Sequence, residues 1–280
     1  MKPTTLIIGG TSGIGLATAK HLSDFGHRLI IIGRDKGRLA EAVEFIRPKQ
    51  EILTLPLDMR HRTSINELFL TLNAQGAYPN NFVWCPASIQ PIGRYDKLDD
   101  YDIENSIQMN LVAPMVFTNR LLIELRARKQ NGRRMILFAG GGDGAMKNFT
   151  SYATAKAAIC RFVENLSYET GHLDFNINAV APGFVWSPIQ EEVLKIGPKK
   201  AGEPYYEMVR QRQHESTWTA DDAKRCIRFL LETKLDINGR VISAKFDDLN
   251  KMETLLEHQY RLRRITSRDG KCFVKNSTVE

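Results

Sequence analysis

No apolar run in this sequence is long enough to cross a membrane. A transmembrane helix needs about 18 apolar residues in succession, and the 280 residues contain no such stretch. The apolar run near the amino end, at residues 4–8, is also too short for the core of a signal peptide. We therefore expect a cytoplasmic protein with no membrane partner.

Cysteine is scarce and scattered. Cys85, Cys160, Cys226 and Cys272 form no CxxC pair and no spacing typical of a metal site. A chain of this length can bury a core that is stable without disulfides or structural metal. We therefore expect free thiols in a reducing compartment and no metal.

The chain has a modest excess of positive charge. Lys and Arg number 39 against 32 Asp and Glu, for a net charge of +7. A nucleic-acid partner, a phosphate-bearing ligand and plain solubility would each explain this excess. No nucleic-acid-binding motif is present, so we predict no nucleic-acid partner and leave the other two explanations open.

Short apolar runs alternate with segments of helical length. The predicted strands are residues 4–8, 28–32, 51–57, 81–85, 133–138, 174–180 and 241–244. The predicted helices are residues 14–25, 39–46, 63–73, 101–128, 151–170 and 220–233. Strands that alternate with helices build right-handed βαβ units and one parallel sheet. The sequence therefore predicts an α/β fold, a three-layer doubly wound parallel β-sheet, in one domain over residues 1–250.

Two segments fall outside this alternation. Residues 186–218 are rich in Pro, Gly, Lys and Glu and follow a strand, so we interpret them as a flexible substrate lid. The alternative is a surface insertion. Residues 251–280 form a basic C-terminal tail, whose arginines either reach an anionic substrate or lie on a solvated surface or subunit contact.

A glycine cluster joins the first predicted strand to the first predicted helix. Gly9, Gly13 and Gly15 have the pattern of a turn that lets a pyrophosphate rest on the free N–H groups of a helix N-terminus. The preceding strand and following helix are the context that this motif requires. The residues predicted to bind a dinucleotide here are Gly9, Thr11, Ser12, Gly13, Ile14 and Gly15.

The residue after the second predicted strand indicates which dinucleotide binds. An acidic residue there would bond the ribose 2′-hydroxyl of NAD(H), but this sequence has Arg34. A guanidinium can pair with a 2′-phosphate through two hydrogen bonds, so NADP(H) is favoured over NAD(H). The alternative is that Arg34 stacks on adenine or faces solvent. Asp58, after the third strand, is placed to bond the adenine amino group or to cap a helix.

Four features, in their order and spacing, resemble the short-chain dehydrogenase/reductases, in the single-domain Rossmann-fold branch. They are the glycine turn, Asn110, Tyr152 with Lys156 four residues later, and Pro182-Gly183, and the pattern holds over about residues 4–245. The resemblance implies hydride transfer between nicotinamide and a carbonyl or secondary alcohol, with Asn110 holding a water of the proton relay. It also places several residues beside the cofactor: Ala87, Pro182, Gly183, Val185 and Ser187.

We assign the chemistry to Tyr152 and Lys156. At i, i+4 on one predicted helix, their side chains can converge on one point. A phenol has an ordinary pKa of about 10, and we expect the Lys156 ammonium and the oxidised nicotinamide to lower that pKa. Tyr152 would then donate a proton in reduction or remove one in oxidation, while Lys156 also holds the nicotinamide ribose. The alternative is that these are ordinary helix residues.

The sequence departs from the family where the family has a substrate-orienting serine. Here that position is Ala139. Our hypothesis is that backbone N–H groups of Gly140 or Gly141 partly replace the missing hydroxyl as oxyanion-hole donors. We also expect Trp186 to border the substrate pocket. The segment at residues 85–88, Cys-Pro-Ala-Ser, replaces the family's usual Asn-Asn-Ala-Gly.

Two functions fit these residues. The first is an NADP(H)-dependent oxidoreductase; sugar, polyketide, acyl and steroid carbonyls all stay open, and an anionic substrate would suit the basic residues. The second is a catalytically weak or inactive dinucleotide-binding protein that acts as a sensor or interaction partner, which the missing serine motivates. The resemblance also implies a homodimer or homotetramer built on helices 101–128 and 151–170, whose apolar residues fit an internal core equally well: Leu111, Met115, Leu122, Ile159, Phe162 and Leu166.

Overall fold

A seven-stranded sheet with the order β3-β2-β1-β4-β5-β6-β7 is the centre of the protein. Every pairing in it is parallel. Its strands are β1 (Thr4–Ile8), β2 (Arg28–Gly33), β3 (Leu53–Pro56), β4 (Asn81–Trp84), β5 (Arg133–Phe138), β6 (Phe175–Ala181) and β7 (Val241–Ser243). The structure is a computed structural model, and it describes residues 3–76, 78–128, 132–140, 145–215, 219–257, 265–266 and 272–273.

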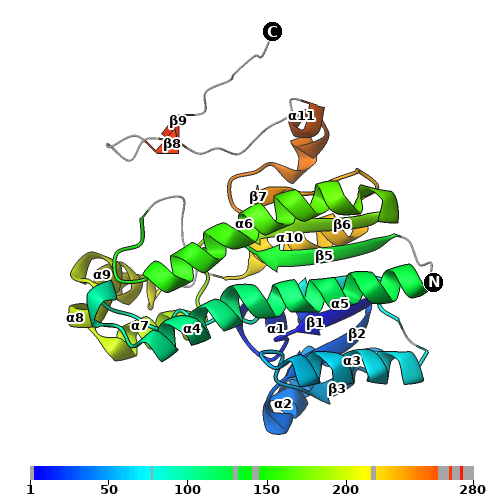
Figure 1. Cartoon of the computed structure of the whole chain (residues 1–280), viewed down its shortest axis with the longest axis horizontal. Helices are drawn as coiled ribbons and strands as arrows, with labels where there is room; N and C mark the ends of the chain where they lie inside the picture. The colour runs from blue at the N-terminus through cyan, green and yellow to red at the C-terminus, as the bar shows by residue number, and fades with distance from the viewer. Residues whose placement is uncertain are drawn as a thin grey trace.

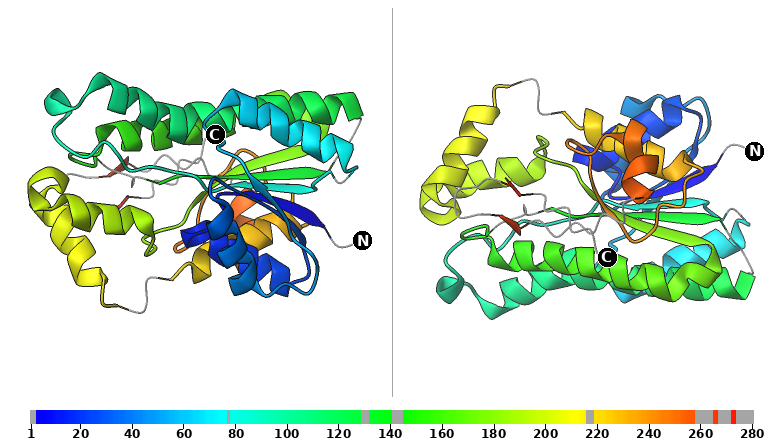
Figure 2. Two further views of the ribbon diagram at one scale, coloured as in Figure 1. Left: turned by 90° about the horizontal axis from the view of Figure 1, so that it is seen from below. Right: turned by 90° about the horizontal axis from the view of Figure 1, so that it is seen from above.

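Helices cover both faces of this sheet (Figures 1 and 2). On one face lie α3 (Arg62–Ala74), α5 (Ala113–Arg128) and α6 (Thr150–Thr170). On the other lie α1 (Gly13–Asp24), α2 (Lys36–Ile46) and α10 (Asp221–Glu232). The predicted three-layer, doubly wound α/β fold is confirmed.

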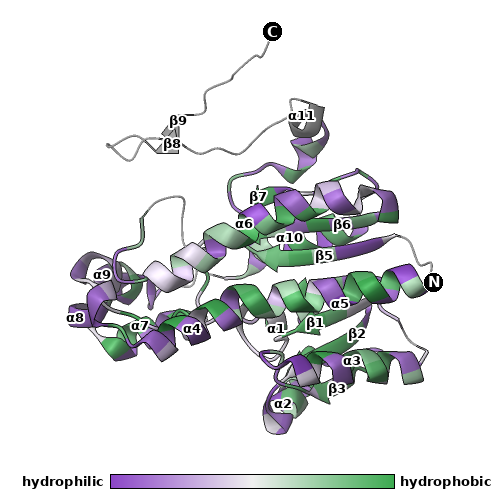
Figure 3. Cartoon of the chain, in the orientation of Figure 1, coloured by the Kyte–Doolittle hydropathy of each residue, from purple (hydrophilic) through white to green (hydrophobic). Residues whose placement is uncertain are grey.

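The strands contribute side chains to the apolar clusters on both faces of the sheet, because successive side chains along a strand point to opposite faces. In β1, Leu6 and Ile8 belong to the apolar cluster under α3, α5 and α6. Ile7, between them, belongs to the cluster under α1, α2 and α10. Such strands are buried on both faces and read as continuous apolar runs, and Figure 3 shows them as mainly hydrophobic.

The predicted helix over residues 101–128 is divided in three. It consists of α4 (Asp100–Ile107), a π-helical turn η2 (Gln108–Val112) and α5. Pro114 has no N–H to donate to the carbonyl of Asn110, four residues earlier, so the regular hydrogen-bond ladder cannot continue through this point. Single π-turns of this kind are often found at functional sites.

The segment that we interpreted as a flexible lid is largely helical in its described part. It forms α7 (Pro188–Ile196), α8 (Pro198–Ala201) and α9 (Glu203–Arg212), and residues 216–218 lie outside the described residues. Each helix has a proline in its first turn, where a proline costs no hydrogen bond and favours helix initiation. Prolines that we took for loop residues therefore begin helices.

The three lid helices have an apolar core of their own. Val193, Ala201 and Val209 are fully buried against Ile89 and Phe149. Because Ile89 follows β4 and Phe149 immediately precedes α6, this cluster attaches the lid helices to the main body.

The predicted boundary at residue 250 cuts through packed structure. After η4 (Leu249–Lys251) the chain enters α11 (Met252–Glu257). Two other short helical turns lie earlier in the chain, η1 (Tyr95–Lys97) and η3 (Gly171–Leu173). Met252 is buried in the cluster under α10, so the domain extends at least to this residue. Beyond α11 the structure describes only a two-stranded pair, β8 (Ile265–Thr266) with β9 (Cys272–Phe273). The arginines of the predicted tail, at positions 261, 263, 264 and 268, lie outside the described residues.

Most of the apolar positions that we named on the two long helices face inward. Ile159 is buried, and four others pack partly buried against the same cluster: Leu111, Leu122, Phe162 and Leu166. Met115 is 38% exposed. Within the described residues, no helix combines the length and apolarity needed to span a bilayer.

Candidate active site

A cavity of about 1110 Å³ opens at the carboxyl ends of the parallel strands. Its walls include Gly9 after β1, Arg34 after β2, Cys85 after β4 and Pro182 after β6. The chain runs outward from β1 to β3 on one side and from β4 to β7 on the other, so the strand order reverses between β1 and β4. In open α/β sheets, ligands bind at this switch point.

The glycine turn forms a cradle at one part of the cavity. Gly9 and Gly13 have φ of +76° and +50°, in the left-handed region that side chains rarely adopt. A Cβ on Gly15 would lie 2.2 Å from the carbonyl oxygen of Gly9. The Ser12 side chain makes no capping hydrogen bond to α1, so the first N–H groups of the helix can bind an anion. A pyrophosphate fits this cradle.

Three arginines line the cavity near the ends of β2 and β3: Arg34, Arg38 and Arg60. Asp58 lies among them and accepts hydrogen bonds from Arg60 Nε, shared between its two oxygens at 3.0 Å, and from Arg60 Nη2. Burial would raise the pKa of Asp58, but the hydrogen bonds from Arg60 outweigh it and lower the pKa. Asp58 does not cap a helix, since the residue at the N-cap of α3 is His61. This end of the cavity combines three arginines with two carboxylates, Asp58 and Asp35, and the Asp35 side chain caps α2 by accepting a hydrogen bond from Arg38 N.

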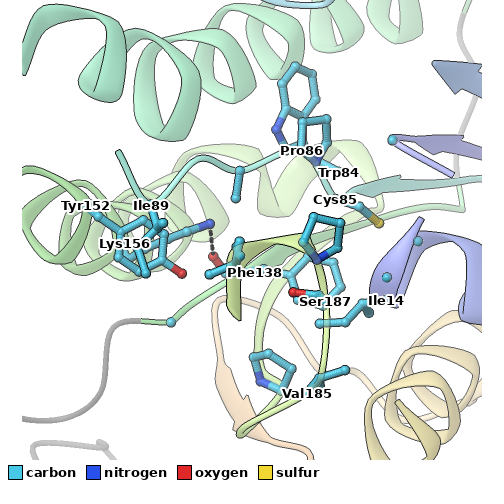
Figure 4. A pocket seen from close by; sticks show the side chains of 18 of the residues that line it. Ile14, Trp84, Cys85, Pro86, Ile89, Phe138, Tyr152, Lys156, Val185 and Ser187 are labelled. Atoms are coloured by element: carbon cyan, nitrogen blue, oxygen red, sulfur yellow. Dashed lines mark hydrogen bonds between the residues drawn. The ribbon is translucent and has the colours of Figure 1, made fainter. Parts of the chain in front are cut away.

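Tyr152 and Lys156 lie together at the other end, on the first turns of α6 (Figure 4). Lys156 Nζ lies 5.7 Å from the centre of the Tyr152 ring and donates a 3.2 Å hydrogen bond to the carbonyl oxygen of Phe138. Both residues line the cavity, and Lys156 is buried. The predicted convergence of the two side chains is therefore seen in the structure.

Burial dominates the ionisation of both groups in the protein without its cofactor. It raises the pKa of Tyr152, and it lowers the pKa of Lys156 to about 8. In this enclosed site each charged form loses the water that would stabilise it. Tyr152 is thus a neutral phenol at pH 7, with a proton available to donate.

Ala139 lines the cavity at the end of β5, and no side-chain hydroxyl is present there. A Cβ on the next residue, Gly140, would lie 3.1 Å from Tyr152 Oη, so the Gly140 backbone is close to the reactive hydroxyl. Gly141, the other predicted donor, lies outside the described residues.

Asn110 does not line the cavity but holds one of its walls. Its side chain accepts a hydrogen bond from Ser88 N (3.1 Å) and donates one to Ser88 O (2.8 Å). A further bond from Asn110 Nδ2 to Ser106 O connects this contact to α4. Asn110 thereby positions the loop after β4, where Pro86 contacts Gly9 and Ala87 lines the cavity.

The segment after β6 closes the cavity over the glycine turn. Pro182, Gly183, Val185 and Ser187 all line it, as predicted. A Cβ on Gly13 would lie 3.2 Å from Ser187 Cβ, and the Ser187 hydroxyl donates to Gln190 Oε1. Trp186 is not part of the cavity wall; it packs in the apolar core of the lid helices.

Sequence reasoning missed several residues of the wall. Arg38 lies in the first turn of α2, four residues after Arg34 and directly behind the strand end that carries the cofactor signal, so its position could have indicated it. Arg60 and Tyr205 carry no such local signal, because tertiary packing alone brings them to the cavity. Within the described residues, no group of three or more His, Cys, Asp or Glu side chains could hold a metal.

The chain has clear relatives among known proteins. The family profile of the short chain dehydrogenases matches residues 3–195. The 3-oxoacyl-acyl-carrier-protein reductase of Rickettsia prowazekii is 28% identical over 190 residues, covering 68% of this chain and 76% of the relative. The levodione reductase of Leifsonia aquatica is 25% identical over 250 residues, covering 85% of this chain and 90% of the relative.

Solved structures share the fold. An actinorhodin polyketide ketoreductase with NADPH superposes with a TM-score of 0.75 at 20% identity, over 86% of this chain and 95% of the other. Levodione reductase gives a TM-score of 0.74 at 21% identity, over 86% and 95%. A dinucleotide cradle and a Tyr-Lys pair at the carboxyl edge of such a sheet are typical of NAD(P)-dependent oxidoreductases. This chain belongs to the short-chain dehydrogenase/reductase family.

Proposed function

We propose that this protein uses NADP(H) to reduce a carbonyl group, in an apolar small molecule, to a secondary alcohol. The observation that carries the proposal is one continuous cavity. It joins the glycine cradle and the arginines around Asp58 to the phenol of Tyr152 and the buried Lys156. A site that binds a dinucleotide and contains a proton-donating side chain has the two parts that carbonyl reduction needs.

The preference for NADP(H) rests on the arginines. Arg34 stands where an acidic residue would bond the ribose 2′-hydroxyl of NAD(H), and Arg38 and Arg60 line the same part of the cavity. Guanidinium groups bind a phosphate through paired, charge-assisted hydrogen bonds. The actinorhodin ketoreductase, similar in fold, was solved with NADPH, in keeping with this proposal.

Tyr152 acts as the general acid. A bound NADPH supplies the hydride that the carbonyl carbon receives. As negative charge develops on the substrate oxygen, the neutral Tyr152 hydroxyl donates its proton to it. The positive charge of Lys156, 5.7 Å from the Tyr152 ring centre, stabilises the phenolate that remains. Since the phenol is protonated at neutral pH, the resting site is prepared for reduction.

The substrate end of the cavity favours an uncharged, apolar compound. Six of the side chains that form it also belong to the apolar cluster of the lid helices: Ile89, Met146, Phe184, Ile189, Tyr205 and Met208. Among the described residues that line this end, Lys156 is the one cationic side chain, and the Arg212 guanidinium lies nearby, 4.7 Å from the centre of the Phe184 ring. A ketone set in an aliphatic or aromatic frame fits such a wall.

The test of this function is cofactor-dependent turnover. Purified protein is mixed with a panel of apolar ketones, and consumption of NADPH and of NADH is followed by absorbance. We expect turnover with NADPH and a lower kcat/KM with NADH. Binding of NADPH without consumption across the panel would instead favour the sensor function that Ala139 motivates.

The cofactor preference is tested by Arg34→Ala. Loss of a paired contact to phosphate costs about 1.5–3 kcal/mol, so KM for NADPH is expected to rise by about 10- to 100-fold, with little change for NADH. Lys36→Ala is the matched control, because Lys36 is exposed nearby and does not line the cavity. Equal effects of Arg34→Ala on both cofactors would contradict the assignment.

We also propose that the face formed by α5 and α6 pairs copies of the chain in a homodimer or homotetramer. Met115, Ile123 and Tyr168 are 38%, 52% and 82% exposed on these helices. Exposed apolar side chains on helices at the molecular surface are common at subunit contacts.

A further inference from the structure

Compared with the family pattern, this site lacks one hydroxyl, that of the substrate-orienting serine. With Ala139 at the end of β5, Tyr152 is the one family hydroxyl left to bind a carbonyl oxygen there. A carbonyl oxygen that gains charge has room for more than one donor, and a single donor leaves it less stabilised than a pair would. The cavity contains a second phenol that the predicted mechanism does not use, that of Tyr205.

Tyr205 is held at the same end of the cavity as Tyr152 by the packing of α9 on the segment that begins α6. Its ring lies 4.8 Å from that of Phe149, at an interplanar angle of 58°. Phe149 immediately precedes α6 and is three residues before Tyr152. Gly202, at the N-cap of α9, lies close to the neighbouring residue Asn148: a Cβ on Gly202 would be 3.2 Å from Asn148 Nδ2. The amino end of α9 therefore contacts the same segment. Figure 1 shows α9 at this end of α6.

Both phenols are available to a ligand. Within the described part of the chain, the hydroxyls of Tyr152 and Tyr205 make no hydrogen bond, and both residues line the cavity. Burial is the main cause that raises the pKa of each, and the nearby Arg212 only partly offsets it at Tyr205. Both phenols therefore carry a proton at neutral pH and can donate it to a hydrogen bond.

We propose that Tyr205 replaces the serine that position 139 lacks, by donating the second hydrogen bond to the substrate carbonyl oxygen while Tyr152 delivers the proton. Tyr205 keeps its own proton throughout, so it stabilises and orients the oxygen without entering the proton transfer. This inference rests on the proposed carbonyl reduction. It assigns a role to the lid helices, since α9 then carries a group that touches the substrate.

Tyr205→Phe tests this role with little disturbance, because the ring that packs on Phe149 is kept. We expect kcat/KM for the best ketone to fall on the order of 100-fold, with the Kd of NADPH unchanged. Tyr206→Phe is the matched control: Tyr206 is the next residue of α9 and packs in the same apolar cluster, but does not line the cavity. It is expected to retain wild-type activity.

A double-mutant comparison separates this role from a structural one. Ala139→Ser restores the family hydroxyl, and we expect it to raise kcat/KM at least tenfold in the Tyr205→Phe background but less than about threefold in the wild type. A carboxamide analogue of the ketone, whose carbonyl accepts the same hydrogen bonds without reacting, should bind about tenfold more weakly to Tyr205→Phe in calorimetry.

The outcomes are distinct. If Tyr205→Phe stays within twofold of the wild type, or if Ala139→Ser gives the same factor in both backgrounds, Tyr205 is not the second donor, although the enzyme is a reductase. If the wild type turns over no ketone of the panel with NADPH, the proposed function fails and this inference fails with it.

Discussion

The buried charge of Lys156 is costly to the fold. The residue is 5% exposed, and the one hydrogen bond of its ammonium in the described structure goes to the Phe138 carbonyl oxygen. Burial lowers its pKa from 10.5 to about 8. A group held in this way is retained for function at the expense of stability, as is common in active sites.

The pH dependence of this destabilisation follows from the pKa of Lys156, which is about 8 in the folded protein and 10.5 in the unfolded chain. Below pH 8 the lysine is charged in both the folded and unfolded states, so the full penalty, about 3 kcal/mol, is present. Between pH 8 and 10.5 the unfolded chain binds more protons than the folded protein, so folding stability rises with pH. Above 10.5 both states are neutral and the penalty is gone.

Lys156→Met is therefore expected to stabilise the protein while abolishing turnover. Allowing for the lost hydrogen bond to Phe138, the free energy of unfolding should increase by about 2 kcal/mol at pH 7. The gain should shrink to near zero by pH 10, as measured by urea unfolding of both proteins at each pH. A variant that is less stable than the wild type at pH 7 would show that burial does not penalise this charge.

At the scale of secondary structure, the junction of β1 and α1 determines whether a dinucleotide can bind. The space between Gly9 and Gly15 has no room for a side chain, since a Cβ on Gly15 would lie 2.2 Å from Gly9 O and 3.2 Å from Cys85 Cβ. A side chain there must displace either the turn or the helix, and with it the N–H groups that bind the pyrophosphate.

Gly15→Ala should accordingly weaken NADPH binding by about 100-fold or more, because the cradle loses its shape. Fluorescence titration with NADPH measures the effect. Gly171→Ala is the control: that glycine also lies at the end of a helix, and nothing is within 4 Å of the position of its Cβ. If Gly15→Ala binds NADPH as the wild type does, the pyrophosphate does not rest on this turn.

Across the whole molecule, the two edges of the sheet serve different purposes. The carboxyl edge carries the cavity. Near the start of β1, His27 Nδ1 bonds Thr5 Oγ1 (2.8 Å) and His27 Nε2 bonds Glu232 Oε1 (2.9 Å). His27 is 4% exposed, and this chain of bonds ties β1 and β2 to α10. These hydrogen bonds at the amino edge therefore contribute to the stability of the fold.

His27→Leu should lower stability and leave the chemistry intact. Removing the imidazole deprives Thr5 and Glu232 of one hydrogen bond each, in and beside a buried site, at a cost of about 1–3 kcal/mol. Thermal unfolding should record the loss, while KM for NADPH and kcat stay within twofold of the wild type. A change in KM with no loss of stability would place His27 in a functional network instead.

The sequence predicted best what depends on neighbouring residues. The strand over residues 133–138 has the predicted bounds, because its apolar run is short and clearly ended. The helix predicted from residue 39 begins earlier, at Lys36, because the Asp35 side chain accepts a hydrogen bond from Arg38 N and caps it. That signal comes from a polar residue, which the periodicity of apolar residues does not detect.

What the sequence did not predict depends on contacts between distant segments. The glycine turn and the Tyr152-Lys156 pair are local patterns, and the structure brings them to one cavity. Tyr205 reaches it only because the lid helices fold back on Phe149. The burial that raises the pKa of Tyr152 in the absence of cofactor is likewise a property of the whole fold.

The most direct test of the account is Tyr152→Phe, assayed for NADPH consumption with the best ketone of the panel. The variant keeps the ring and loses only the hydroxyl, so NADPH should bind as in the wild type. We predict that kcat/KM falls by about 10²- to 10⁴-fold, the usual contribution of a positioned general acid. Activity within twofold of the wild type would contradict the account, because the proton would then come from another group.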